Sequence, residues 1–111
     1  MRRRALALAG VTAVLAASTA GAATTRVVIG DNFFVRDGGR PTVRVAAGDT
    51  VRWVWRGENI HNVSVLRGPV KFHSGFKRRG SFRRTLTHPG TYIVYCSVHG
   101  YPEQWMRLVV R

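Results

Sequence analysis

Short runs of β-branched and aromatic residues, each bounded by Gly, Pro or Asp, fill the chain from residue 26 to its end. Such runs are typical of β-strands, and no window shows a convincing helical period. The runs predict strands at Arg26–Gly30, Thr42–Ala46, Thr50–Trp55, Ile60–Leu66, Ser81–Leu86, Thr91–Cys96 and Met106–Val110. Several of them alternate apolar with polar residues, which indicates one buried and one solvated face. The fold class expected is all-β, a Greek-key β-sandwich.

A Gly-Gly, a Gly-Asp and a Pro-Gly pair separate these runs. Gly38-Gly39 and Gly48-Asp49 can adopt positive φ or bond their own backbone, and Pro89-Gly90 suits a tight turn. Each pair therefore predicts a turn between two strands.

The first residues have the layout of a secretory signal peptide. Arg2, Arg3 and Arg4 precede an apolar run from Ala5 to Ala17, and an A-x-A site ends at Ala22. The run is shorter than the roughly 20 residues that a membrane-spanning helix needs, which disfavours an anchor. A twin-arginine signal is a poor match in its flanking residues, so the export route stays open. We expect a signal peptide over residues 1–22 and one exported domain over residues 23–111, in a periplasm or outside the cell.

The chain is strongly basic, with a formal net charge of +13, and Lys77–Arg84 holds a concentration of this charge. The charge favours an acidic protein partner or an anionic surface, or it simply keeps a small domain soluble. Export argues against nucleic acid as the partner. With 111 residues there is no room for a second core, and a monomer is expected.

A single cysteine, Cys96, cannot form an internal disulfide, although small exported domains commonly depend on them. A free thiol would be open to oxidation outside the cytoplasm, so it should be buried or bound to a metal. Cys96 closes one predicted strand, His99 follows in the loop, and Met106 opens the next strand. His61 comes from another strand. A thiolate, two imidazoles and a thioether form a soft donor set that suits copper.

The residues that carry this donor set also resemble the small blue copper proteins of the cupredoxin family, of the plastocyanin and pseudoazurin kind. The similarity covers nearly all of the expected mature chain, through GDTVRWVW, IHNV, PGTYIVYC and SVHG. It implies one type 1 copper ion with His61, Cys96 and His99 as equatorial ligands and Met106 as the weak axial ligand.

The resemblance also implies roles for neighbours of these ligands. Asn62 would tie the two ligand loops together through Ser97, and Tyr95 would offer an electron path to the thiolate. The six residues between His99 and Met106 exceed the usual spacing in plastocyanin-like loops. Gln104 lies nearer, at a spacing similar to that of the glutamine-ligated stellacyanins. Met106 is preferred as the axial ligand, with Gln104 as the alternative.

His73 and His88 match no ligand position of the family and are expected to be ordinary loop residues. The ligand set predicts an electron carrier, not an enzyme, that exchanges single electrons with a redox donor and acceptor. In the family, partners dock at an apolar patch around the second histidine, here His99 with Gly100, Tyr101 and Pro102.

Other functions stay open on the sequence alone. A copper carrier or buffer would need the same ligands but an easier exit for the metal. An enzyme with Cys96 as nucleophile and His99 as base is a poor match, because that chemistry needs a base within hydrogen-bond reach and oriented by a third group, whereas this pair is spaced i, i+3 with a soft ligand at Met106. A basic polyanion-binding domain is a further alternative.

Overall fold

The computed structural model describes residues 21–35 and 42–111, and these residues form eight strands and no helix. The strands are β1 (Thr24–Gly30), β2 (Phe33–Val35), β3 (Thr42–Val45), β4 (Thr50–Trp55), β5 (Ser64–Arg67), β6 (Ser81–Thr85), β7 (Gly90–Tyr95) and β8 (Trp105–Val110). Among the described residues no helix could cross a membrane. Residues 1–20 and the expected turn at Gly38-Gly39 lie outside the described residues, so the signal peptide and that turn stay predictions.

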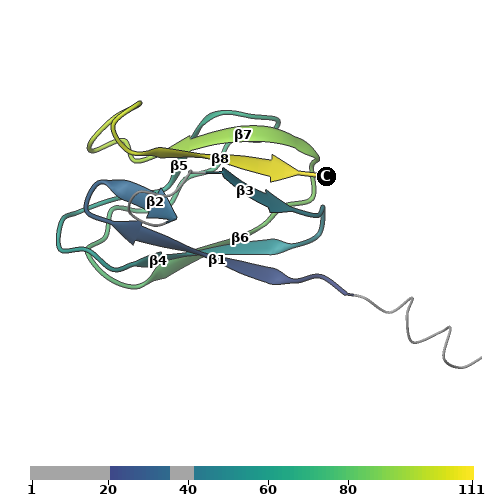
Figure 1. Cartoon of the computed structure of the whole chain (residues 1–111), viewed down its shortest axis with the longest axis horizontal. Helices are drawn as coiled ribbons and strands as arrows, with labels where there is room; N and C mark the ends of the chain where they lie inside the picture. Colours follow the sequence, from purple (N-terminus) through teal and green to yellow (C-terminus); the bar gives the residue numbers. More distant parts are fainter. Residues whose placement is uncertain (1–20, 36–41) are drawn as a thin grey trace, which may run out of the picture.

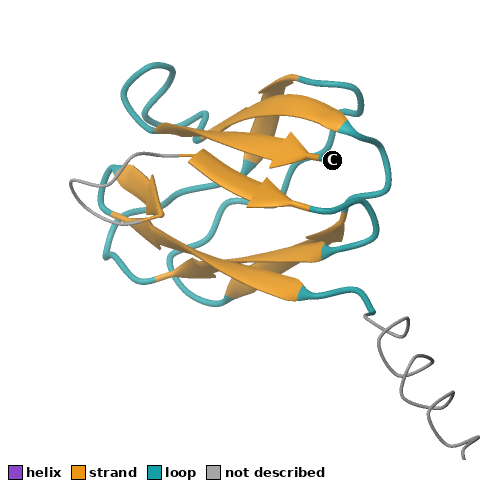
Figure 2. Ribbon diagram, turned by 45° about the vertical axis from the view of Figure 1, so that its right-hand side comes forward, coloured by secondary structure: helices purple, strands orange, loops and turns teal. Residues whose placement is uncertain are grey.

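The strands form two four-stranded sheets that pack face to face, as Figures 1 and 2 show. One sheet has the order β2-β1-β4-β6 and the other has the order β3-β8-β7-β5. β1 runs parallel to β4 and β3 runs parallel to β8, whereas the other neighbours are antiparallel. The predicted all-β sandwich is confirmed.

Alternating side chains from both sheets build the core between them. In β8 the inward-facing Met106, Leu108 and Val110 are buried, and the residues between them are more exposed. Trp53 of β4 meets this row from the opposite sheet and is fully buried. A strand places alternate side chains on opposite faces, so the period-two pattern in the sequence becomes one apolar face per sheet.

Two strand predictions differ from the structure. β2 was not predicted, because a three-residue strand is too short to show a period. The strand expected over Ile60–Leu66 begins only at Ser64. His61 instead pairs alone with Lys77, through two backbone hydrogen bonds of 2.9 and 3.0 Å. The residues from His61 to Val63 are therefore a fixed loop that precedes the strand.

Three connections meet at one end of the sandwich, on the left in Figure 1. They are the turn from β1 to β2, the loop that follows β4 and the loop from β7 to β8. Parallel β1 and β4 end on the same side, and β7 ends there from the opposite sheet. This end lies away from the C-terminus and holds the candidate site.

Candidate metal centre

Cys96 follows β7 and begins a closed loop that returns to β8 at residue 105. The Cys96 N–H donates to the carbonyl of Gln104 at 3.0 Å, which continues the β7–β8 ladder by one step. Gly100, with φ of 84°, donates to the Cys96 carbonyl at 2.8 Å, and Gln104 donates to the Gly100 carbonyl at 3.0 Å. Positive φ favours glycine, so Gly100 allows the tight turn that folds His99 back over Cys96.

His61 lies in the loop after β4 and its backbone is fixed on both sides. Its N–H donates to Lys77, and its carbonyl accepts from the Lys77 N–H and from the indole Nε1–H of Trp55, at 3.1 Å. The His61 side chain is fully buried. The imidazole therefore has little freedom to turn away from the end of the sandwich.

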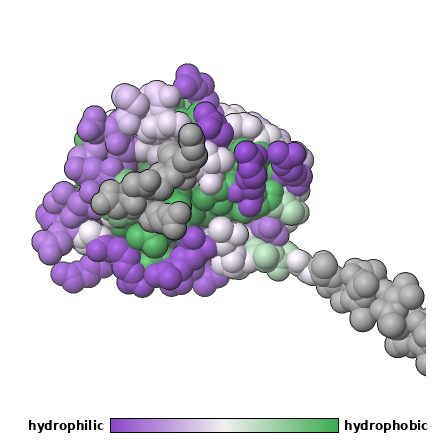
Figure 3. All heavy atoms as spheres, in the orientation of Figure 1, coloured by the Kyte–Doolittle hydropathy of each residue, from purple (hydrophilic) through white to green (hydrophobic). Residues whose placement is uncertain are grey.

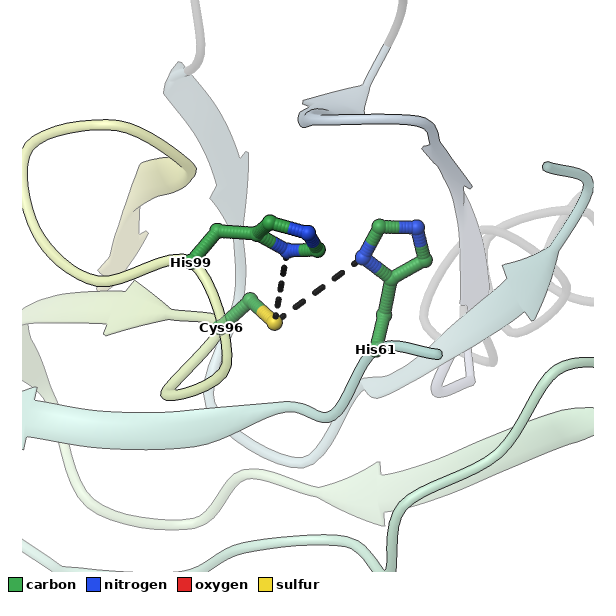
Figure 4. A group of neighbouring side chains, drawn as sticks. All are labelled: His61, Cys96 and His99. Atoms are coloured by element: carbon green, nitrogen blue, oxygen red, sulfur yellow. Dashed lines mark hydrogen bonds between the residues drawn. The ribbon is translucent and has the colours of Figure 1, made fainter. Parts of the chain in front are cut away.

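These two segments bring His61, Cys96 and His99 together, as Figure 4 shows. The Cys96 Sγ lies 3.6 Å from Nδ1 of His99 and 3.9 Å from Nδ1 of His61. One donor atom from each of the three residues lies within 4.8 Å of the other two. Cys96 and His61 are buried, while His99 is partly exposed. The buried thiol thus faces two imidazole nitrogens.

Asp31, in the turn from β1 to β2, holds the far side of the His61 ring. Its Oδ1 lies 2.8 Å from His61 Nε2. The same carboxylate accepts backbone N–H groups from Glu58 at 2.9 Å and from Asn59 at 3.0 Å. The Glu58 hydrogen bond, followed by those of His61 and Asn59, lowers the Asp31 pKa from 3.8 to about 2. An ionised carboxylate only accepts, so a hydrogen bond between Asp31 Oδ1 and His61 Nε2 needs its proton on Nε2, while Nδ1 is the ring nitrogen that faces Cys96.

Gln104 is fully buried and supplies a fourth polar atom to the same place. Its Nε2 donates to the carbonyls of Gly30 and Phe33, both at 3.1 Å. Those two acceptors fix the orientation of the amide, because only the NH₂ group can donate. The Oε1 therefore faces inward, 3.2 Å from Nδ1 of His99.

The donor set matches copper in kind. Two imidazole nitrogens and one thiolate are ligands for Cu(I), Cu(II) and Zn(II), and a trigonal His₂Cys set with a weak axial donor is typical of blue-copper sites. The group of His61, Cys96 and His99 fits a type 1 copper site and could bind one copper ion.

Solved structures of copper proteins have the same fold as this chain. A glutamine-for-methionine variant of amicyanin in the Cu(I) state is similar over 79% of this chain and 82% of its own, with 27% identity and a TM-score of 0.65. A methionine-to-alanine variant of amicyanin, also Cu(I), is similar over 86% of this chain and 89% of its own, with 26% identity and a TM-score of 0.66. The chain has an amicyanin-like cupredoxin fold.

A copper-containing nitrite reductase from Thermus scotoductus SA-01 shares this fold, with a TM-score of 0.64 and 24% identity over 79% of this chain. The chain spans only 22% of that enzyme. No protein-family model matches the chain. The similarity to the cupredoxin family that the sequence predicts is confirmed by the similarity to the amicyanin structures.

Met106, the expected axial residue, lies further along β8, away from the three grouped residues. It pairs with Val94, two residues before Cys96, so it sits about 7 Å further along the sheet. Its Sδ accepts the indole N–H of Trp53 at 3.4 Å in the core. Gln104 instead lies opposite Cys96 and has its Oε1 beside His99. The structure brings three of the four predicted ligands together and places Gln104, the alternative, next to them.

The expected link between the two ligand loops is confirmed. The Asn62 Oδ1 accepts from the Ser97 N–H at 2.7 Å and from the Ser97 hydroxyl at 3.2 Å. This fixes the residue after His61 to the residue after Cys96. Tyr95 is partly buried in β7, and its role as an electron path stays a prediction.

The remaining histidines lie outside the group. Nδ1 of His73 lies 3.2 Å from the carbonyl of Ser74, and Nδ1 of His88 lies 3.2 Å from the hydroxyl of Thr87. Within residues 21–35 and 42–111, only His61, Cys96 and His99 form a cluster of this kind. Asp31 was missed, because it precedes His61 by 30 residues and only the fold brings the two together.

Large apolar side chains are exposed close to the ligand loops. They are Ile60, Phe76, Val98 and Tyr101, with exposed fractions of 38%, 64%, 49% and 44%. Ile60 precedes His61, Val98 precedes His99, and Phe76 precedes the Lys77 that pairs with His61. We call these four residues the apolar rim. Tyr101 follows His99 by two residues, so each member of the rim is close in sequence to His61, His99 or Lys77.

A basic hollow of about 630 Å³ lies beside the loop that follows β4. It is lined by Trp55, Arg56, Gly57, Glu58, Arg78 and Arg79. The Trp55 indole N–H donates a hydrogen bond to the carbonyl of His61, and the Glu58 backbone N–H donates one to Asp31. The hollow therefore adjoins the residues around the site. Hydrophilic residues cover much of the same end of the molecule in Figure 3.

Proposed function

We propose that this chain is an exported electron-transfer protein with one type 1 copper ion. The observation that carries the proposal is the group of one buried thiol, one buried imidazole and one partly exposed imidazole, with their donor atoms within 4.8 Å of one another. Copper bound there would supply a one-electron Cu(I)/Cu(II) couple. The similarity to amicyanin structures in the Cu(I) state supports this choice of metal. Export rests on the signal peptide expected over residues 1–22.

We assign the ligands as His61, Cys96 and His99, with the amide oxygen of Gln104 as the weak fourth donor. Gln104 is preferred to Met106 because its Oε1 already faces His99, whereas the Met106 sulfur accepts from Trp53 in the core. An amide oxygen is a harder donor than a thioether and favours the more highly charged Cu(II).

The chain would hold these donors in the same place in the Cu(I) and the Cu(II) state. Asn62 ties the two loops, the Lys77 pairing fixes His61, and Gly100 closes the loop after Cys96. Donors that cannot rearrange keep the geometry alike in both oxidation states, which is what rapid electron exchange needs. A copper carrier would need looser donors, so rigidity favours electron transfer over delivery.

All four proposed donors come from the chain itself, and catalytic metal sites usually keep one position open for substrate. For this reason we propose an electron carrier without catalytic activity. The partly exposed ring edge of His99, beside Val98 and Tyr101 of the apolar rim, is the proposed place of contact with donor and acceptor proteins.

The basic hollow favours partners with a negatively charged contact surface. Arg56, Arg78 and Arg79 stand next to the apolar rim and favour a redox protein with carboxylates around its own contact patch. Opposite charges steer such encounters and raise association rates, and salt weakens the effect.

The proposal is tested by stopped-flow electron exchange between the Cu(I) protein and two small oxidised redox proteins of similar potential, one acidic and one basic. We expect faster oxidation by the acidic partner, and a rate that falls as salt is raised. Arg78→Gln with Arg79→Gln should slow the reaction. Arg44→Gln with Arg111→Gln, an equal charge change at the other end of the sandwich, should slow it less. Equal rates for both double variants would contradict the steering.

Retention of the metal separates electron transfer from copper delivery. An electron carrier should lose Cu(I) slowly to a competing chelator and exchange electrons quickly. Rapid loss of Cu(I), together with slow electron exchange, would favour the carrier alternative.

A further inference from the structure

We propose that Asp31 is the positioning residue of the copper site, setting the tautomer of His61 and stabilising the oxidised metal. The inference rests on the proposed function. Asp31 is not itself a proposed ligand. It acts on His61 through Nε2, the ring nitrogen that faces away from the site.

Both carboxylate oxygens of Asp31 accept hydrogen bonds. Oδ1 receives His61 Nε2 at 2.8 Å and the Asn59 N–H at 3.0 Å, and Oδ2 receives the Glu58 N–H at 2.9 Å. The side chain of Asp31 is 34% exposed, and that of His61 is fully buried. The carboxylate is thus held from three directions against a ring that has no contact with water.

Gly57 shows that the loop approaches Asp31 closely. A Cβ at this position would lie 2.2 Å from Asp31 Oδ1 and 2.9 Å from the Asp31 backbone nitrogen. A residue with a side chain would displace the carboxylate or the loop. The absence of a Cβ at residue 57 therefore lets the Glu58 and Asn59 N–H groups reach Asp31.

The same turn also orients the fourth proposed donor. Gly30 and Phe33, on either side of Asp31 and Asn32, accept the two amide hydrogens of Gln104. One short turn of the chain, residues 30–33, thereby holds donors that come from two different loops. It precedes every proposed ligand in the sequence.

Two effects follow from electrostatics. A proton fixed on Nε2 leaves Nδ1 free to bind metal, so no rearrangement of the imidazole is needed. The negative charge of the Asp31 carboxylate, next to the far nitrogen, also makes the ring a stronger donor and stabilises Cu(II) more than Cu(I). Removal of the charge should weaken Cu(II) binding and raise the reduction potential.

The first test needs no variant. In the copper-free, full-length protein at neutral pH, long-range ¹H–¹⁵N correlation spectra report which nitrogen of His61 carries the proton. The proposal predicts protonation at Nε2 with a bare Nδ1. A ring protonated at Nδ1 alone would overturn it, whatever the metal does.

The second test compares Asp31→Asn with Asp49→Asn. Asp49 is a matched control, because its carboxylate also accepts two backbone N–H groups, from Ala23 and Ala46, but it lies at the other end of the sandwich. Loss of a hydrogen-bond partner of a metal-binding histidine typically costs 10–100-fold in affinity. For Asp31→Asn we expect a loss of about tenfold or more in Cu(II) affinity relative to Cu(I).

A tenfold change in that ratio is about 59 mV for one electron, measured by voltammetry as a higher potential. Asp49→Asn should leave the potential unchanged, and Asp31→Glu should restore part of the shift. Equal potentials for Asp31→Asn and Asp49→Asn would overturn the proposal. Absence of a copper–thiolate spectrum in the unaltered protein would instead contradict the proposed function, while the tautomer test still stands.

Discussion

Replacement of Gln104 by leucine should change both the stability of the copper-free protein and the properties of its copper site. Gln104 is fully buried, and its Nε2 makes two hydrogen bonds of 3.1 Å, to the carbonyls of Gly30 and Phe33. Leucine fills a similar volume but cannot donate. The Gly30 carbonyl keeps a second partner, the Asn32 N–H at 2.9 Å, and the Phe33 carbonyl loses its hydrogen bond from the amide.

A buried acceptor that loses its partner costs about 1–3 kcal/mol. For a domain of this size, each kcal/mol lowers the unfolding temperature by about 4–8 °C. Thermal unfolding of copper-free Gln104→Leu, followed by circular dichroism, should therefore give a melting temperature at least about 4 °C lower. In the copper-loaded protein the potential should rise, because the hard amide oxygen no longer favours Cu(II).

Met106→Leu is the matched control, since it also replaces a fully buried side chain of similar size. It removes the Trp53–Met106 contact of 3.4 Å and should cost less than about 1.5 kcal/mol. The copper spectrum and the potential should remain unchanged. If Met106→Leu shifted both and Gln104→Leu shifted neither, the fourth donor would be Met106 and the reasoning from the structure would be refuted.

Three further changes test the scaffold. Gly57→Ala should destabilise the protein, because its Cβ would lie 2.2 Å from a carboxylate oxygen; Gly75→Ala, with nothing within 4 Å, should be nearly neutral in urea unfolding. Asn62→Ala should cost about 1–3 kcal/mol through the lost Ser97 hydrogen bonds and weaken copper binding; an unchanged copper affinity would contradict its role in joining the loops. Asp49 has a pKa lowered from 3.8 by hydrogen bonds from two backbone N–H groups, so its stabilisation is present above about pH 4 and lost on acidification. Asp49→Asn should flatten that acid dependence, and an identical pH profile would contradict it.

The strands and the end of the sandwich at which Cys96 and His99 lie could be predicted, because each depends on local pattern. Alternation within Thr50–Trp55 and Met106–Val110 marks inward faces, and Cys96 with His99 sits at the end of a strand. These features need only the period of a β-strand and the chemistry of a thiol. His61 was identified through its company with the other two donors and through the family resemblance.

The choice between Gln104 and Met106 as the proposed fourth donor depends on the strand register, which the number of residues in a loop does not give. Gln104 and Met106 differ by two positions and therefore face the same side of the sheet. Only the pairing of Cys96 with Gln104 shows which of them lies at the end of the sandwich. The sequence favoured Met106 because a thioether is the more common axial ligand. In this fold, however, the Met106 side chain packs in the core against Trp53.

Asp31 lay beyond prediction for a related reason. It stands in a turn whose second strand, β2, is three residues long and gives no periodic signal. Its contact with His61 requires parallel pairing of β1 with β4, a contact between distant parts of the chain. Long-range pairing of this kind is decided by the packing of the whole sandwich.

The proposed function requires that His61, Cys96 and His99 bind copper together, with Cys96 as a buried thiolate. Its most direct test is the visible absorption spectrum of the protein after addition of one equivalent of Cu(II), with Cys96→Ser as the control. We expect an intense blue band from the copper–thiolate bond, which should be absent in Cys96→Ser. No such band in the unaltered protein, or the same band in Cys96→Ser, would contradict it.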